Sequence, residues 1–350
     1  AWDISYYAEK LKQSRYAFND EDVRPYFPLP RVLEGLFDVA HRLFGVTVKS
    51  ATVEQVWHPD VSFFHILDAD GELRGRFFLD LYAREHKRGG AWMADCIGRC
   101  RTGLGALQVP AAFLTCNFPP PVDDQPSLLA HDDVVALFHE FGHGLHHLLT
   151  QVDELAVAGI NGVPWDAVEL PSQFLENWCW EGAALAGIAG HYQTGEPLPA
   201  KLLGRMRGAR NFQSALQMVR QLEFSVFDLG LHGQEAPATV AAIQQALDQV
   251  RARVAVIEPP SYNRFQNSFS HIFAGGYAAG YYSYKWAEVL SADAFGRFQE
   301  EGIFNAACGA DFLHLILEAG GVNEPLENFV AFRGREPTVD ALLHQAGLDH

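Results

Sequence analysis

Sequence typical of β-strands is confined to one stretch of this chain, residues 51–118. Apolar residues alternate on both sides of the short turn at residues 68–71 (DADG), which predicts a hairpin. A further short strand is expected just before the three prolines that begin at Pro119. The strand-like segments are residues 53–67, which include Val53 and Val56, residues 76–82 and residues 111–118.

Most of the remaining sequence has apolar residues at the spacing of helices. The expected helices are residues 3–20, 30–45, 132–150, 168–190, 199–230, 237–255, 277–300 and 309–319. No internal repeat is visible, and no linker divides the 350 residues. The sequence therefore predicts a mostly α-helical fold, with one small sheet within about residues 51–118 and one large domain over residues 1–350.

The charge balance excludes two classes of partner. The chain has 26 Lys and Arg against 43 Asp and Glu, a net charge of −17, and no basic cluster. Such a surface repels phosphate backbones and anionic lipids, so neither nucleic acid nor a membrane is an expected partner. No apolar run approaches the roughly 20 residues that a membrane-spanning helix needs.

The cysteines indicate a reducing compartment. Their number is odd and their spacing fits neither a disulfide framework nor a four-ligand zinc site, so we expect reduced, buried thiols. The first residues contain neither the basic region nor the apolar region of a signal peptide. We therefore expect a cytoplasmic protein. The cysteines are Cys96, Cys100, Cys116, Cys179 and Cys308.

The most informative motif is H-E-x-x-H at residues 139–143. On a helix, His139 and His143 project from the same face one turn apart, so both imidazoles can bind one zinc ion. Glu140 can then act as the general base towards a zinc-bound water. Asp132 and Asp133 are expected to cap this helix. The bare pattern also arises by chance in about 4% of chains of this composition, so its context has to decide.

A catalytic zinc needs a third protein ligand and one open position. His146 shares the helix face but lies about 10 Å along the axis from His139, too far for bonds of about 2 Å to one ion. We expect it to be a packing residue or to support a ligand. The remaining candidates are downstream carboxylates, among which spacing alone does not choose: Glu154, Glu169, Glu176 and Glu181.

Several sequence blocks together resemble the thimet oligopeptidase and oligopeptidase A family of zinc metallopeptidases. The likeness is strongest to the bacterial oligopeptidase A members, with the dipeptidyl carboxypeptidases as the next relatives. The blocks extend over nearly the whole chain, which makes the resemblance specific. They are residues 79–85 (LDLYARE), 87–92 (KRGGAW), 137–143 (LFHEFGH), 166–178 (DAVELPSQFLENW), 271–277 (HIFAGGY), 281–284 (YYSY) and 328–337 (NFVAFRGREP).

The resemblance implies a third zinc ligand and a fold. It assigns this ligand to Glu169 and implies one Zn²⁺ per chain. Members of the family are mostly helical, two-lobed and zincin-like, and their deep channel admits short peptides. They also carry a long helical N-terminal segment before the region matched here, so the chain resembles the catalytic C-terminal part, and the missing segment is a possible partner.

Residues 271–284 combine glycines with His271, Tyr277, Tyr281 and Tyr284. A phenol can donate a hydrogen bond to the oxyanion that forms during peptide hydrolysis, and glycines let the segment move. The resemblance assigns substrate contacts to His271, Tyr277 and Tyr284, whereas Tyr281 is equally well explained as a packing residue.

Two other features are weaker. Gln173 and Glu176 are candidates for orienting the metal ligands, although each is also explained as a helix-surface or capping residue. Residues 111–118 would be able to pair with an extended peptide if they formed an edge strand.

The sequence therefore predicts a zinc-dependent endopeptidase that hydrolyses short oligopeptides by attack of a zinc-bound water. The metal ligands are His139, His143 and Glu169, and the catalytic residues are Glu140, His271, Tyr277 and Tyr284. Two alternatives stay open: a dipeptidyl carboxypeptidase of the same family, and a fragment that binds zinc or peptide without turnover.

Overall fold

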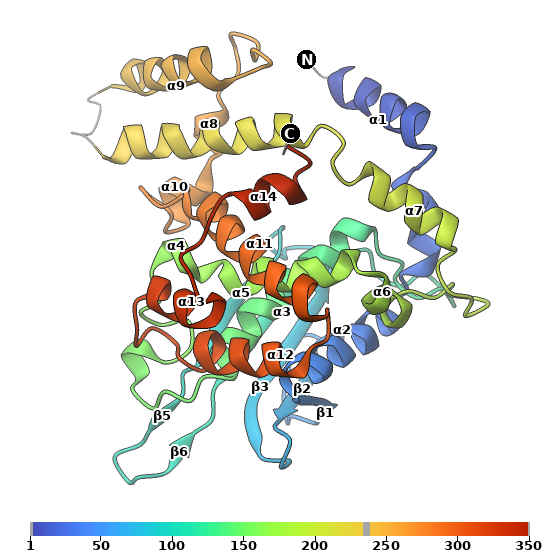
Figure 1. The fold of residues 1–350 in the computed structure, drawn as a ribbon, viewed down its shortest axis with the longest axis vertical. Coiled ribbons are helices and arrows are strands. Elements are labelled where there is room, and N and C mark those ends of the chain that lie inside the picture. Colours follow the sequence, from blue (N-terminus) through green and yellow to red (C-terminus); the bar gives the residue numbers. More distant parts are fainter. Residues whose placement is uncertain (1–2, 234–238, 349–350) are drawn as a thin grey trace.

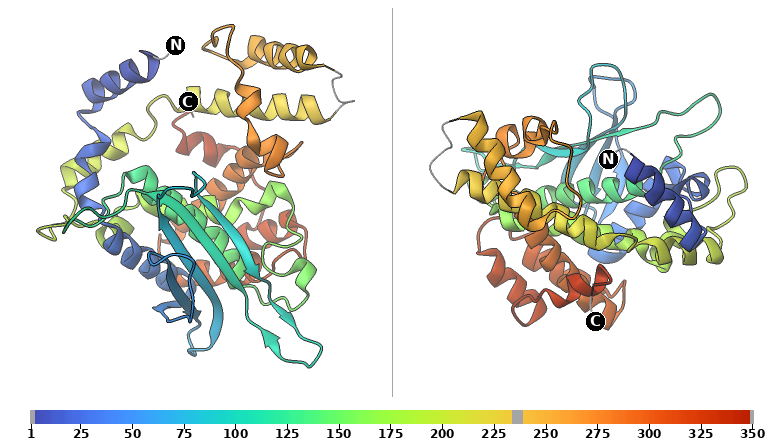
Figure 2. Two further views of the ribbon diagram at one scale, coloured as in Figure 1. Left: turned by 180° about the vertical axis from the view of Figure 1, so that it is seen from behind. Right: turned by 90° about the horizontal axis from the view of Figure 1, so that it is seen from above.

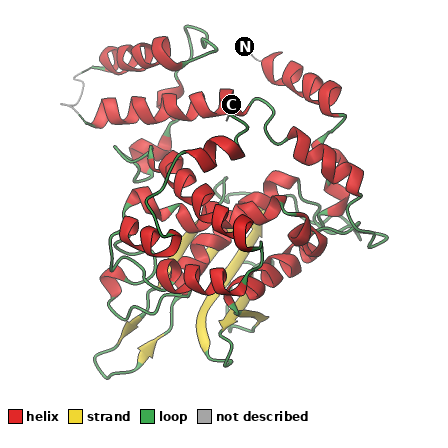
Figure 3. Ribbon diagram, viewed as in Figure 1, coloured by secondary structure: helices red, strands yellow, loops and turns green. Residues whose placement is uncertain are grey.

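The computed structural model describes residues 3–233 and 239–348, most of which are helical (Figure 3). The α-helices are α1 (Asp3–Tyr16), α2 (Leu29–Phe44), α3 (His131–Leu148), α4 (Trp165–Val168), α5 (Leu170–Glu176), α6 (Gly182–Ile188), α7 (Ala200–Ala209), α8 (Ser214–His232), α9 (Val240–Val254), α10 (Ser270–Ala274), α11 (Ser283–Glu301), α12 (Ala306–Phe312), α13 (Pro325–Arg333) and α14 (Asp340–Gln345). The strands are β1 (Thr47–Ser50), β2 (Ser62–Leu67), β3 (Leu73–Tyr82), β4 (Trp92–Ile97), β5 (Cys100–Arg101), β6 (Leu107–Gln108) and β7 (Ala111–Phe118).

Five strands form one mixed sheet in the order β1-β2-β3-β7-β4. Strands β3 and β7 are parallel, and the other neighbouring pairs are antiparallel. The predicted hairpin joins β2 to β3, where Gly71 has φ +83° and the Asp68 carboxylate accepts hydrogen bonds from two backbone amides of the turn. Strands β5 and β6 form a separate two-stranded ribbon.

Helices cover one face of the five-stranded sheet, as the view from behind shows (Figure 2). Phe77 of β3 contacts Phe37 of α2 and Phe141 of α3, at ring distances of 6.4 and 5.7 Å. The main hydrophobic core lies here and extends to α5, α11 and α12. The opposite face of the sheet carries an aromatic cluster of Trp57, Phe63, Phe78 and Phe113. The sheet is thus a buried platform for α3.

Helices α8 and α9 lie side by side above this core (Figure 1) and belong to a second hydrophobic cluster. That cluster contains Phe227, Leu231, Leu247, Phe269, Ile272 and Tyr281. The fold class is as predicted from the sequence, mostly helical with a small sheet, and the sheet residues lie between positions 47 and 118.

The strand predictions differ from the structure at several points. Val53 and Val56 lie in a loop, and β1 and β4 were not predicted. Residues 111–118 do form a strand, but β7 lies between β3 and β4 and has no free edge. The edge strand beside the site is β4, because the chain reverses after β4 and β7 enters the sheet on its inner side.

Three predicted helices are interrupted. Residues 168–190 contain α5, a 3₁₀ turn (Asn177–Trp180) and α6, while residues 199–230 break between α7 and α8. The predicted helix 309–319 is α12 followed by a π-helical turn (Leu313–Leu317).

Two other predicted helices differ at their first residues. Helix α11 begins at Ser283 instead of residue 277. Positions 237 and 238 of the predicted helix 237–255 lie outside the described residues.

All five cysteines are free thiols, but Cys96 is exposed and Cys100 is half-buried, so the expectation that all are buried was wrong for these two. Cys96 lies in the edge strand β4 and Cys100 in β5 of the two-stranded ribbon, both away from the main core. Within residues 3–233 and 239–348, no helix is long and apolar enough to cross a membrane.

Candidate metal centre

The histidine motif lies on α3, which crosses the sheet next to β7 and β4. The imidazole rings of His139 and His143 are 5.0 Å apart, as expected for residues one helical turn apart. The predicted cap was wrong: the helix begins at His131, so Asp132 and Asp133 lie in its first turn. The carboxylate of Asp133 reaches back and accepts a hydrogen bond from the Ala130 amide at 2.9 Å, which satisfies one of the free N–H groups at this end.

Helix α5 packs closely against α3, and a glycine makes this possible. A Cβ atom on Gly142 would lie 2.5 Å from the carbonyl oxygen of Pro171 and 2.6 Å from Cα of Ser172. Real atoms do not approach so closely, so any side chain at position 142 would push the two helices apart. Glu169, the residue just before α5, is thereby brought against the histidines of α3.

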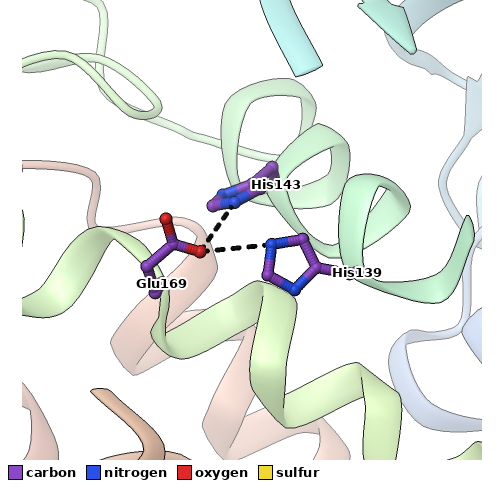
Figure 4. Close-up of side chains that lie close together, drawn as sticks. All are labelled: His139, His143 and Glu169. Atoms are coloured by element: carbon purple, nitrogen blue, oxygen red, sulfur yellow. Dashed lines mark hydrogen bonds and ion pairs between the residues drawn. The ribbon is translucent and has the colours of Figure 1, made fainter. Parts of the chain in front are cut away.

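Three side chains converge at this helix contact (Figure 4). Oε2 of Glu169 lies 3.2 Å from Nε2 of His139 and 3.1 Å from Nε2 of His143. One ligand atom from each side chain falls within 4.8 Å of the other two. Two imidazole nitrogens and one carboxylate oxygen are a donor set of catalytic zinc sites, so the residues fit that ion.

Other side chains fix the orientation of these groups. The Glu169 carboxylate is buried and accepts hydrogen bonds from the hydroxyls of Ser172, at 3.1 Å, and Tyr277, at 2.8 Å. On the far side of the His139 ring, Nδ1 lies 2.6 Å from Oε1 of Glu176. A carboxylate behind a ligating histidine fixes the ring and makes it a better ligand. Glu176 therefore has the supporting position considered for it from the sequence.

The charges in the cluster are strongly coupled. Burial opposes protonation of His139, but hydrogen bonds to Glu169 and Glu176 raise the pKa of this histidine well above its usual value. Burial also opposes ionisation of Glu169, yet hydrogen bonds from both histidines hold the pKa of this carboxyl well below its usual value. The hydrogen bonds thus favour the ionised form of Glu169, which is the form that binds metal ions.

Glu140 lies beside the ligand cluster without belonging to it. It is 6% exposed, and it lines the same pocket as Met93 of the edge strand β4. Burial raises the pKa of Glu140, although the positive charges of His139 and His143 partly offset this effect. A buried carboxylate with a raised pKa next to a metal site is suited to accept a proton.

A pocket of about 470 Å³ opens over these groups. The sequence-predicted residues His139, Glu140, His143, Glu169, His271, Tyr277 and Tyr284 all line it. Its other lining residues were not predicted individually. They are Arg88, Ala91, Trp92, Met93, Ile160, Val163, Trp165, Val168, Ser270 and Gly275. The pocket thus offers apolar walls and one arginine around the metal ligands.

The segment before β4 is firmly anchored. Lys87, which is 5% exposed, donates to the backbone carbonyls of Asp80, Tyr82 and Cys116 and to the Asp80 carboxylate. The side-chain amide of Asn117 donates to the carbonyls of Arg88 and Gly90. The sequence block KRGGAW was noted for its family resemblance, but only the structure shows that it leads into the pocket edge.

The other predicted ligand candidates lie elsewhere. Glu154 is exposed, and Glu181 pairs with Arg207 at 3.5 Å. His146 is buried, and burial together with the neighbouring imidazoles lowers its pKa to about 3, as for a neutral packing residue. Gln173 donates to the backbone carbonyl of Tyr284 at 3.1 Å. It therefore contacts the segment of residues 271–284, called the aromatic loop below, and not His139, His143 or Glu169.

The aromatic loop covers the pocket. The rings of Tyr277 and Tyr284 stack at 5.0 Å, and the Tyr277 hydroxyl donates to Glu169. The ring of His271 lies 6.2 Å from that of Tyr277 and 6.4 Å from that of Tyr284. Tyr281 instead packs in the second hydrophobic cluster, with its hydroxyl on Gln221. Its packing interpretation is therefore the correct one.

Comparisons with known sequences agree with this geometry. The model of peptidase family M3 matches residues 1–348. The chain is 58% identical to oligopeptidase A of Salmonella typhimurium and of Escherichia coli over 347 residues, 99% of this chain and 51% of each relative. It is 38% identical to a dipeptidyl carboxypeptidase of Salmonella typhimurium over 351 residues, 100% of this chain and 51% of that relative. The chain thus spans about half the length of these relatives.

Solved structures show the same fold at low sequence identity. A carboxypeptidase of Pyrococcus furiosus superposes with a TM-score of 0.54 at 15% identity, over 93% of this chain and 59% of that one. PZ peptidase A gives a TM-score of 0.53 at 18% identity, over 77% of this chain and 42% of that one.

Proposed function

Because the chain belongs to peptidase family M3, we propose that it is the catalytic domain of a zinc-dependent endopeptidase acting on short oligopeptides. The observation that carries this proposal is the convergence of His139, His143 and Glu169 beside the buried Glu140, inside one pocket. One zinc per chain would be held by the two imidazoles and the Glu169 carboxylate. Zinc in such a site lowers the pKa of water and polarises the peptide carbonyl.

Glu140 acts as the general base in the proposed reaction. Its carboxylate takes the proton from the attacking water and then gives it to the nitrogen of the leaving amine. Two features of its position support this role: it lines the same pocket as the two histidines, and burial raises its pKa. Extended substrates are expected to lie along β4, whose outer edge is free.

The phenols take different roles. Tyr277 orients Glu169 through its hydrogen bond to Oε1. Tyr284 donates a hydrogen bond to the oxyanion of the transition state, and His271 contacts the substrate. Burial, and then the charge of Glu169, raise the pKa of both phenols above the usual value, so both keep the protons that they donate.

Tyr284→Phe removes only the hydroxyl donor, so we expect kcat to fall about 10²–10³-fold while KM changes little. The ring keeps its stacking with Tyr277, and the melting temperature should therefore barely move. Measuring kcat, KM and melting temperature for Tyr284→Phe and Tyr284→Ala on one short peptide tests the role. A Phe variant with unchanged kcat would make Tyr284 a packing residue only.

Glu176→Gln is expected to weaken zinc binding about 10–100-fold. The substitution removes the negative charge that lies next to Nδ1 of His139, which makes this histidine a weaker ligand. The apparent Kd is measured by competition with a chelator of known affinity. Glu181→Gln is the matched control, since Glu181 pairs with Arg207 away from the pocket. Equal zinc affinity in both variants would remove Glu176 from the metal centre.

The reaction type is tested with the zinc-loaded protein and an internally quenched fluorescent peptide blocked at both ends. Cleavage of internal bonds, identified by mass spectrometry, is the expected result. Release of C-terminal dipeptides alone, and only from peptides with a free carboxylate, would favour the dipeptidyl carboxypeptidase alternative. Stoichiometric zinc without any turnover would favour the non-catalytic alternative.

We also propose that the active enzyme includes a further helical segment preceding this region, as its relatives are about twice as long. Helix α1 supports this: no residue of it is buried, and Ile4, Tyr6, Tyr7 and Leu11 are exposed. A segment packed there would help to wall a channel that admits only short peptides. The free cysteines are consistent with a cytoplasmic enzyme, and the net charge of −17 disfavours nucleic acid and anionic membranes.

A further inference from the structure

A fully buried carboxylate lies behind the aromatic loop, on a helix that contributes nothing to the pocket lining. Asp228 of α8 is 0% exposed. Its Oδ1 accepts hydrogen bonds from the Ala279 amide at 3.0 Å and from Nδ1 of His232 at 2.7 Å. Its Oδ2 accepts one from the Tyr281 amide at 2.8 Å. Three donors thus stabilise the charge, and two of them are backbone groups of the loop.

Those two amides belong to a turn with unusual backbone geometry. Ala279 has φ +56°, a left-handed conformation that is unfavourable for a residue with a side chain. In this conformation neighbouring amides point towards the same side, where they bind an anionic group. Asp228 supplies that group, so its carboxylate compensates for the strain and fixes the shape of the turn.

The turn connects the two phenols of the pocket. Tyr277 lies two residues before Ala279, and Tyr284 lies three residues after Tyr281. The Tyr277 hydroxyl donates to Glu169, and the Tyr284 carbonyl accepts from Gln173 of α5. The loop is therefore held on one side by the metal centre and on the other by α8, which Figure 1 shows above α10 and α11.

Tyr281 strengthens the attachment to α8. Its ring packs among Phe227, Phe269 and other members of the second hydrophobic cluster, and its hydroxyl donates to Gln221 of α8 at 3.1 Å. This tyrosine therefore points away from the pocket while its own amide binds Asp228. The hydrogen bonds and the apolar contacts both tie the turn to the same helix.

We propose that Asp228 is a positioning residue, which holds the turn at residues 277–284 so that the hydroxyls of Tyr277 and Tyr284 face the metal centre. Asp228 does not line the pocket and acts only through the loop. Its effect on catalysis rests on the proposed peptidase function, whereas its effect on the loop does not. The two are therefore tested by separate measurements.

The first measurement is hydrogen exchange of the loop in Asp228→Asn. Asparagine keeps one acceptor oxygen in place of two, and its NH₂ group then faces the N–H of either Ala279 or Tyr281, so one amide of the turn loses its partner. Exchange of amides in residues 275–284 is expected to become faster. The matched control is Asp293→Asn: Asp293 is equally buried but binds Arg333, Arg335 and the Thr338 amide instead of the loop. Exchange of residues 275–284 should not change in this control.

The second measurement is turnover of the quenched peptide by the zinc-loaded variants. A displacement of about 1 Å costs up to about 10²-fold in rate, so kcat of Asp228→Asn should fall about 10–10²-fold with KM and zinc content nearly unchanged. In a background of Tyr277→Phe with Tyr284→Phe, the same substitution should cause almost no further loss, because it acts through the two hydroxyls. Asp293→Asn should keep the parent kcat even if it lowers the melting temperature.

Three results would overturn the proposal: unchanged loop exchange in Asp228→Asn, full kcat despite a loosened loop, or a loss that is additive with the tyrosine substitutions. A parent protein that binds zinc but cleaves no peptide would instead refute the peptidase function, and loop exchange would still decide whether Asp228 holds the turn. If Asp228→Asn does not fold, Asp228→Glu serves as the second variant. It keeps the charge but lengthens the side chain by one methylene, so the carboxylate can no longer meet both loop amides in the same way. Loop exchange should become faster and kcat should fall, and parent-like values of both would overturn the proposal.

Discussion

Replacing Glu169 by alanine is expected to leave the protein without zinc and without measurable peptide hydrolysis. Two imidazoles on one helix are an incomplete site, because catalytic zinc needs three protein ligands. The substitution also removes the carboxylate that accepts hydrogen bonds from Ser172 and Tyr277. Metal analysis after dialysis, together with turnover of a short quenched peptide, measures both losses.

The matched control for this prediction is Glu154→Ala. Glu154 is an exposed carboxylate that the sequence left open as a ligand, and its loss should change neither zinc content nor kcat. Melting curves of metal-free Glu169→Ala and metal-free parent protein separate ligand loss from unfolding. One zinc per chain retained by Glu169→Ala would show that the third ligand lies elsewhere.

Glu140→Gln is expected to lower kcat by at least about 10²-fold while zinc stays bound. The amide has nearly the shape of the carboxylate, so the packing around this buried position should survive. The amide cannot accept a proton at neutral pH. The attacking water therefore has no general base, and the leaving amine has no general acid to protonate it. Steady-state kinetics and metal analysis on the same preparation separate the chemical step from metal binding.

The contrast between the two substitutions is itself informative. Glu169→Ala should lose zinc, and Glu140→Gln should keep it, although the two carboxylates line one pocket. Near-normal turnover by Glu140→Gln would exclude it as the base and leave the proton transfer to another group. A loss of zinc in Glu140→Gln would mean that this residue also supports the metal ligands.

The part of the site that lies on one helix was predictable from sequence alone. His139, Glu140 and His143 have fixed relative positions because the helical period sets them. The position of Glu169 was not predictable, because its distance from the two histidines depends on how α5 packs against α3. Only the family resemblance selected Glu169 among the four candidate carboxylates. Asp228 gave no signal at all, since its partners are backbone amides about 50 residues away in the sequence.

The fold class was predictable for the same reason, and the details of the fold were not. Apolar periodicity locates helices but does not reveal where they break, as after Glu176 or between Ala209 and Ser214. Strand order depends on contacts between distant segments, so the internal position of β7 and the edge position of β4 had no local signature. Both misjudged features lie next to the pocket.

Position 142, one of the two variable positions of the histidine motif, has to be glycine in this protein. Its missing side chain lets Pro171 and Ser172 come within the distance that a methyl group would occupy. The spacing of the metal ligands is consequently a property of the gap between two helices, and not of the motif alone. Anyone who transplants the five-residue motif into another helical scaffold must also transplant this close helix crossing. Otherwise the design will contain two histidines and a base, but no third ligand within reach.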